Sequence, residues 1–325
     1  MMHSNKSRGF TLIEISIALV IIGLTIGGII VGQDLINSAA IRAQITQIDK
    51  YQAAVGAFVN KYNYLPGDIP NPYATNAGLI IRGVAAGGAV GAGTSDGLGD
   101  GNGIIQGNCN TATGITGVAA EECGELAVFW SDLSTAGLID GTFPTSSNSG
   151  TDGYPFAGIG SYTVTLTSVK TTLYNWYPVA KVGGNNVFVY VMSFNFPNTN
   201  YFVISTITHL FHDIESTANP GVTVQQAYNI DTKIDDGLPQ SGNVLACYVN
   251  YLVEHDMAAP PAGNNLVGAN GGYTTAWHHC TPTTTATAYA STNCYDNNNV
   301  AGTQTYSIIN NGNIPNCALS FKFTQ

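Results

Sequence analysis

Charged side chains are scarce in this chain of 325 residues. Only 9% of the residues are charged, with 10 Lys and Arg against 20 Asp and Glu, and the formal net charge is −10. Proteins that bind nucleic acid through a broad basic surface need the opposite balance, so we expect no nucleic-acid partner of that kind. The chain is not expected to be disordered, because 44% of its residues are apolar.

Several motifs that carry catalysis or metal binding are missing. No Cys-x-x-Cys pair is present, which excludes a zinc ribbon and a thioredoxin-like site of the usual spacing. The glycine-rich stretch lacks the Gly-Lys-Ser/Thr ending of a phosphate-binding loop. The spacing of His209, His212 and Glu215 would place three metal-ligand types near one helical face, with ordinary surface histidines as the alternative. We therefore expect no enzymatic activity.

One long stretch lacks charge altogether. The 18 residues from Ile15 to Gly32 carry no Asp, Glu, Lys or Arg. As a helix they would be roughly 27 Å long, close to the ~30 Å hydrocarbon core of a bilayer. Lys6 and Arg8 precede this run, so the positive-inside rule keeps the leader in the cytoplasm. The sequence therefore predicts a single membrane span with a cytoplasmic N-terminus.

The leader joins the apolar run through Gly9-Phe10-Thr11-Leu12-Ile13-Glu14. This motif resembles the processing site of type IV pilins and of the pseudopilins of type II secretion. The resemblance implies that prepilin peptidase cuts between Gly9 and Phe10, removes residues 1–9, and methylates the new amine of Phe10. It also implies that Glu14 of one subunit pairs with the Phe10 amine of a neighbour during assembly. An ordinary secretory signal would instead have a small-residue cleavage site after its apolar region.

The same resemblance implies a structural subunit of a type IV pilus or of a secretion pseudopilus. Its partners would be copies of itself or homologous subunits, prepilin peptidase and the inner-membrane assembly machinery. The chain would stand in the inner membrane before assembly, and in a periplasmic or extracellular filament afterwards. Two alternatives stay open at this point. The filament can be a pilus or a pseudopilus, and the chain can be a minor tip subunit that acts as an adhesin or binding module.

Residues 10–62 read as one helix, because no proline occurs before Pro66. Residues 10–32 are the membrane and filament-core half. They contain small-xxx-small pairs formed by Gly23, Gly27, Gly28 and Gly32. Such pairs suit close helix packing, and the alternatives are local unwinding or simple tolerance of glycine in lipid. Residues 33–62 are an amphipathic continuation with a stripe spaced by three and four residues: Ile41, Ile45, Ile48, Gln52, Val55, Val59 and Tyr62.

Residues 63–325 are expected to form a globular head of the α+β class. A helix is predicted over 125–136, and a second follows the capping-box pattern Thr223 to Gln226 and runs to about Ile234. Strands are predicted over 162–169, 187–194, 201–208, 243–249 and 317–323. The mainly antiparallel sheet would pack on the second half of the long helix. Loop-rich insertions are expected at about 74–120 and 258–304.

Six cysteines in an oxidising compartment predict up to three disulfides, with 15 possible connectivities. Short separations favour Cys109–Cys123 and Cys280–Cys294, which leaves Cys247–Cys317.

Two groups of acidic residues are candidates for a cation. Asp96, Asp100 and Asn102 lie among glycines and could supply oxygen ligands to calcium, with Glu121, Glu122 or Glu125 as a distant carboxylate. The alternative is a turn-rich loop held by Asx turns. Asp235 and Asp236 end the second predicted helix, where they oppose its dipole. Such a turn needs compensation from backbone donors or from a cation.

Overall fold

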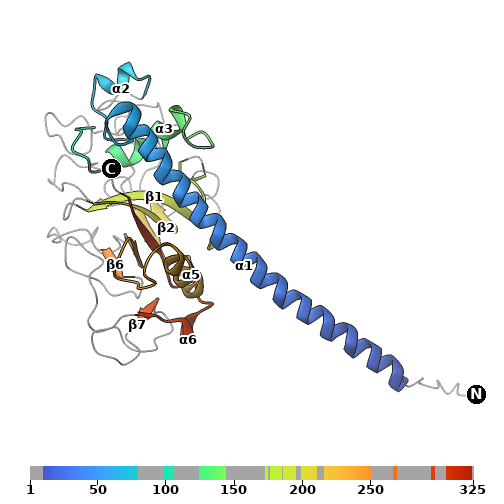
Figure 1. Ribbon diagram of the computed structural model, residues 1–325. Helices are drawn as coiled ribbons and strands as arrows, with labels where there is room; N and C mark the ends of the chain where they lie inside the picture. The colour runs from blue at the N-terminus through green and yellow to red at the C-terminus, as the bar shows by residue number, and fades with distance from the viewer. Residues whose placement is uncertain are drawn as a thin grey trace, which may run out of the picture.

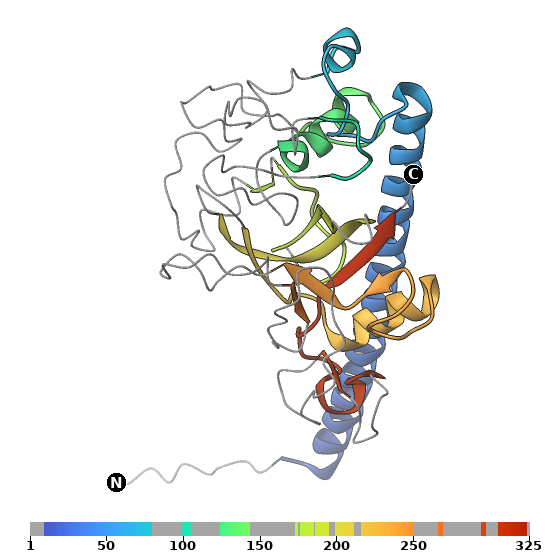
Figure 2. The same cartoon turned by 90° about the vertical axis from the view of Figure 1, so that its left-hand side faces the viewer.

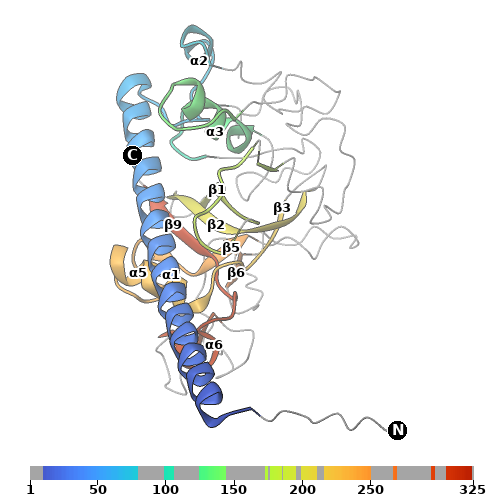
Figure 3. The same cartoon turned by 90° about the vertical axis from the view of Figure 1, so that its right-hand side faces the viewer.

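The computed structural model describes eleven stretches of the chain: residues 10–79, 99–105, 124–143, 173–174, 176–184, 186–194, 199–210, 216–249, 266–268, 294–296 and 305–323. One long helix, α1, runs past a head built from a sheet and short helices (Figure 1). The head lies against the C-terminal half of α1, and the N-terminal half extends beyond it (Figures 1 and 3). The predicted α+β class is confirmed.

Helix α1 spans Leu12–Tyr62, in agreement with the predicted single helix. Thr11 is its N-cap, and Asn63 ends it in the left-handed conformation at φ 61°, where the Asn63 N–H donates to the Val59 carbonyl at 2.8 Å. The helix therefore stops at an αL cap before Pro66 is reached. Pro66 and Gly67 then prevent it from resuming.

The two halves of α1 differ in burial. Its first buried residue is Ile41, and the predicted stripe is buried at Ile48 and Val55 as well. Gln52 is the exception to that stripe, since its side chain is exposed. Gln44 and Gln47 are buried in its place because the backbone of residues 179–181 gives them hydrogen bonds. The second half of α1 is therefore a wall of the head.

The main sheet is antiparallel and has the order β1-β2-β9-β4, with β3 also paired to β2. Its strands are β1 Val187–Phe194, β2 Thr199–Leu210, β3 Ser216–Asn219, β4 Val244–Leu245 and β9 Leu319–Phe323. The predicted strands at 187–194, 201–208 and 317–323 are confirmed, and the one at 162–169 lies outside the described residues. The predicted strand 243–249 is divided. Its end, β5 Cys247–Val249, leaves the main sheet and pairs with β6 Leu266–Gly268.

Aromatic side chains join α1 to the sheet. Tyr51 on α1 meets Trp130 on α3 (Gly124–Thr135) edge-on with ring centroids 4.8 Å apart. Phe202 on β2 stacks on Phe323 of β9 at 4.3 Å. These rings fill one core with the buried face of α1, and burial of such side chains stabilises the fold by about 1.5–3 kcal/mol each.

Short helices complete the head. Helix α5, Val224–Ile234, begins with the predicted capping box, in which Thr223 and Gln226 each accept from the other's backbone N–H. Helices α2, Tyr73–Asn76, and α6, Ile308–Asn311, lie at opposite ends of the head (Figure 2). Strands β7 Tyr295–Asp296 and β8 Thr305–Tyr306 pair beside α6.

The disulfide prediction is wrong at two of its three pairs. Cys294 is bonded to Cys317, with their Cα atoms 5.0 Å apart and both side chains fully buried. This excludes Cys280–Cys294 and Cys247–Cys317. The reason is topological: Cys317 forms a bridge with Val222 just before β9, and Cys294 directly precedes β7, so folding brings together cysteines that sequence separation does not favour. The predicted pair Cys109–Cys123 lies outside the described residues.

Candidate assembly site

Glu14 is held at the start of α1 by a reciprocal capping box with Thr11. The Thr11 backbone N–H and its hydroxyl both donate to Glu14 Oε2 at 2.8 Å, and the Glu14 N–H donates to Thr11 Oγ1 at 3.4 Å. Such a box pairs backbone donors that the first helical turn leaves free. The pattern Thr-x-x-Glu is visible in the sequence, so this role of Thr11 could have been recognised there.

The capping box leaves half of the carboxylate available. Both hydrogen bonds from Thr11 end on Oε2, and Oε1 has no bond within the described residues. Phe10 directly precedes the Thr11 N-cap and has 84% of its surface exposed. The structure thus places Phe10 and Glu14 together at the free end of α1, while Gly9 lies outside the described residues.

The N-terminal half of α1 is apolar and uncovered. Its large apolar side chains, from Leu12 to Ile36, are 51–87% exposed. Its polar hydroxyls bond back to the helix, since Ser16 donates to the Ile13 carbonyl and Thr25 to the Ile22 carbonyl. Within the described part of the chain, α1 is the one helix long and apolar enough to cross a membrane.

The four glycines proposed for helix packing also lie on this half. An added Cβ at Gly23, Gly27, Gly28 or Gly32 would meet no described atom within 4 Å. Within the described residues, the glycines therefore serve no contact. Close packing against another helix stays a prediction.

The first acidic group combines Asp68, Asp100 and Glu125, whose carboxylate oxygens lie within 4.8 Å of one another. Asp68 accepts from the N–H groups of Gly101 and Gly103 at 2.6 and 2.8 Å, and Glu125 accepts from Gly99 N–H at 2.9 Å. Burial raises the pKa of Asp68 to about 7, and the negative charge of Asp100 adds to the rise, while the two N–H donors oppose it.

These carboxylates hold the loop 99–105 against the turn that follows α1. Asn102 N–H donates to Asp100 Oδ1 at 2.9 Å, which is the Asx turn expected as the alternative to calcium. Glu125, one of the three glutamates that the sequence suggested as a distant carboxylate, is a member of this group. Asp68 was missed, because it lies 32 residues before Asp100. Asp96, Glu121 and Glu122 lie outside the described residues, and calcium binding by Asp96, Asp100 and Asn102 stays a prediction.

The second acidic group is Asp231, Asp235 and Asp236 at the end of α5. Asp231 accepts from Gly237 N–H at 3.1 Å, Asp236 from Leu238 N–H at 2.8 Å, and Asp235 from Asn243 N–H. The Tyr306 hydroxyl on β8 donates to Asp231 at 2.7 Å. Of the two predicted compensations, backbone donors are therefore present. Tyr306 could not be found from sequence because 75 residues separate it from Asp231.

The histidine candidates do not form a described site. His209 belongs to strand β2 and not to a helix. The prediction that His209 shares a helical face with His212 and Glu215 is therefore wrong for His209. The remaining members lie outside the described residues.

Residues 4–30 match the family model described as the prokaryotic N-terminal methylation motif. Comparisons with curated proteins and with solved structures found no match. The match covers the end of the predicted leader and most of the apolar half of α1, and the motif is the signature of type IV pilins and pseudopilins. A chain with this motif and an apolar N-terminal helix fits an inner-membrane-anchored pilin-like subunit, which is a structural class rather than a catalytic one.

Proposed function

We propose that this chain is a structural subunit of a type IV pilus-like or type II secretion pseudopilus filament. Prepilin peptidase would cut it between Gly9 and Phe10, and the subunit would then leave the inner membrane to join a filament outside the cytoplasm. One observation carries the proposal: the N-terminal half of α1 is apolar, exposed on every side, and preceded by the matched methylation motif. Such a surface needs lipid or other helices around it.

Glu14 would guide assembly through its charge. A carboxylate in a bilayer costs a few kcal/mol unless it is paired. The Thr11 donors satisfy Oε2 within the subunit, and Oε1 remains for a donor from outside. Cleavage after Gly9 creates that donor, because the new amine of Phe10 is positively charged. Pairing Glu14 with the Phe10 amine of a neighbour would set the register of the incoming helix.

Substitutions at Glu14 test this mechanism. Glu14→Gln keeps an acceptor for Thr11 and removes the charge, whereas Glu14→Val removes both. We expect both variants to insert and to be cleaved, as shown by mass spectrometry of the N-terminus, and both to yield at least about tenfold fewer filaments than the wild type. Glu14→Asp is the matched control that retains the charge. Normal filament numbers for Glu14→Val would contradict the proposed role.

Two experiments determine the position of the subunit in the filament and the type of filament. Many copies along purified filaments indicate a major subunit, and labelling confined to one end indicates the tip position expected of an adhesin or binding module. A pilus and a pseudopilus are distinguished by deleting the gene and measuring surface filaments and protein secretion in parallel. Imaging of labelled filaments from the native cell makes the first measurement, and N-terminal mass spectrometry of the same filaments shows whether the subunit was cut after Gly9.

A further inference from the structure

Basic side chains gather along one face of α1. Five of the six Lys and Arg in the described stretches lie on α1 or are bonded to it through their backbone, although the chain as a whole is acidic: Arg42, Lys50, Lys61, Lys181 and Lys322. The three on α1 lie within about 100° around the helix axis at 3.6 residues per turn. Asp49 is the one acidic residue of α1 between Arg42 and Lys61. This exposed face therefore differs in charge from the rest of the protein.

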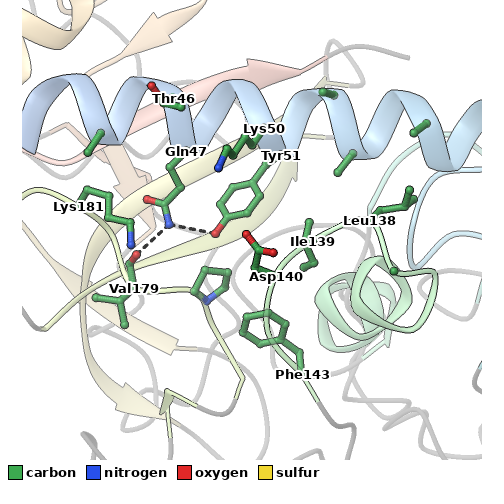
Figure 4. Close-up of a pocket in the computed structure, with 16 residues that line it drawn as sticks. Thr46, Gln47, Lys50, Tyr51, Leu138, Ile139, Asp140, Phe143, Val179 and Lys181 are labelled. Carbon is green, nitrogen blue, oxygen red and sulfur yellow. Dashed lines mark hydrogen bonds between the residues drawn. The ribbon is translucent and has the colours of Figure 1, made fainter.

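A groove runs along one edge of this face (Figure 4). Its volume is about 870 Å³, and it is lined by α1, by residues 137–143 and by residues 178–181. Small residues of α1, including Ala43, Ala53 and Ala57, form one side, and apolar residues, including Leu138 and Phe143, form the other. Such a lining allows a helix to approach closely and to bury an apolar side chain.

The charged groups that line the groove favour an acidic binding partner. Lys50 and Lys181 both line it and are exposed, with Asp140 as the one carboxylate in the lining. On its wall, the Gln47 amide nitrogen donates to the Tyr51 hydroxyl at 3.0 Å and to the Val179 carbonyl at 2.9 Å. The Gln47 Oε1 atom is buried without a hydrogen-bond partner among the described residues. Gln47 thus ties α1 to residue 179 on the wall of the groove, and its buried oxygen is not exposed to a partner.

We propose that this groove receives the α1 segment 31–38 of a second copy of the chain, an inference that rests on the proposed filament function. Asp34 of the second copy would face Lys50 and Lys181. Leu35, which is 66% exposed in its own chain, would enter the apolar lining.

The contact requires two copies at different heights. Asp34 and Lys50 are 16 residues apart on α1, so parallel copies must be staggered by about 24 Å for them to meet. Two copies standing at the same depth in a membrane cannot make this contact, whereas staggered copies in a filament can. Lipid headgroups are poor alternative occupants, because Lys50 is 18 residues or about 27 Å beyond Gly32, where the uncharged run ends.

Charge exchange in the full-length chain tests the pairing. Reversing both lysines, Lys50→Glu with Lys181→Glu, should lower the fraction of subunit found in filaments by about tenfold, because like charges then face each other. Adding Asp34→Lys to the same chain should restore that fraction to within about twofold of wild type. Lys233→Glu is the matched control, since Lys233 is exposed on α5, away from the groove. Cleavage and subunit level should stay unchanged in every variant.

Photo-crosslinking gives a second, direct measurement. A photoreactive amino acid in place of Leu35 should link to residues 43–57 or 137–143 of another copy in purified filaments. Normal assembly of the double reversal, no restoration by Asp34→Lys, or crosslinks elsewhere in wild-type-like filaments would each overturn the inference. Failure of the wild-type chain to enter any filament would instead contradict the proposed function.

Discussion

Asp231 shows how a buried carboxylate can hold distant parts of this head together. Its side chain is fully buried, and it accepts from Gly237 N–H on its own turn and from the Tyr306 hydroxyl on β8. Burial raises its pKa to about 7, the nearby charges of Asp236 and Asp235 add to the rise, and the two donors oppose it. The carboxylate is therefore a titrating link between α5 and the C-terminal part of the head.

Removing the hydroxyl in Tyr306→Phe should destabilise the head in a pH-dependent way. The pKa of Asp231 is higher in the folded protein than the usual ~3.9 of an unfolded chain. Its contribution to stability is thus fully present below about pH 4 and is lost as pH rises through about 7. Without the donor from Tyr306 the pKa of Asp231 rises further, so we expect a loss of about 1–3 kcal/mol at pH 8 and a smaller loss at pH 5.

Thermal melting of the detergent-solubilised chain at the two pH values measures this effect. Asp68 has a raised pKa as well and produces a slope of the same sign in both proteins, so the difference between variant and wild type reports on Asp231. Tyr228→Phe is the control, because Tyr228 packs edge-on against the Tyr306 ring at 6.0 Å and is half-buried. Equal losses at pH 5 and pH 8 for Tyr306→Phe would contradict the proposed link.

At the scale of elements, the turn after α1 depends on a close approach between two backbones. Gly67 has φ +88°, and its N–H donates to Asp132 Oδ2 on α3 at 2.7 Å. A Cβ at this position would lie 2.5 Å from the Glu125 carbonyl oxygen. Both the left-handed backbone and the contact with α3 therefore require glycine here.

Gly67→Ala and Gly78→Ala form a matched pair that separates these two requirements. Gly78 has φ +71°, but a Cβ there would meet no described atom within 4 Å. We expect Gly78→Ala to cost about 1–2 kcal/mol, the price of a left-handed backbone with a side chain. Gly67→Ala should cost at least about 3 kcal/mol, because it also pushes α3 away from the turn. Denaturant unfolding measures both, and equal losses would show that the contact with Glu125 is unimportant.

Local sequence patterns predicted the helices well, but they did not predict which elements pair or pack against one another. Periodicity and the lack of proline defined α1, and the Thr223 capping box defined the start of α5, because both signals act within a few residues. The insertion of β9 between β2 and β4 has no local signal, since strand pairing depends on which surfaces meet on folding. The Cys294–Cys317 bond and the donation from Tyr306 to Asp231 follow from that same topology, and neither could be predicted from spacing.

At the scale of the whole molecule, α1 belongs to two environments. Its N-terminal half makes no contact that buries a side chain, whereas its C-terminal half contributes Ile41, Ile48 and Phe58 to the core of the head. The boundary lies near residues 37–40, a few residues after Asp34, the first charge beyond the apolar run. The N-terminal half of α1 can therefore move from one environment to another while the head stays folded.

Deletion from the N-terminus tests this division. A chain that begins at Asn37 should melt within about 2 °C of the detergent-solubilised full chain, because the deletion removes no buried side chain from the head. A chain that begins at Asp49 loses Ile41 and Ile48, whose burial is worth about 1.5–3 kcal/mol each, and should melt at least about 10 °C lower. It also loses Gln44 and Gln47, which bond the backbone of residues 179–181. Lower stability of the first deletion would mean that the membrane half supports the head, and subunits could then not exchange lipid for neighbouring helices without disturbing their fold.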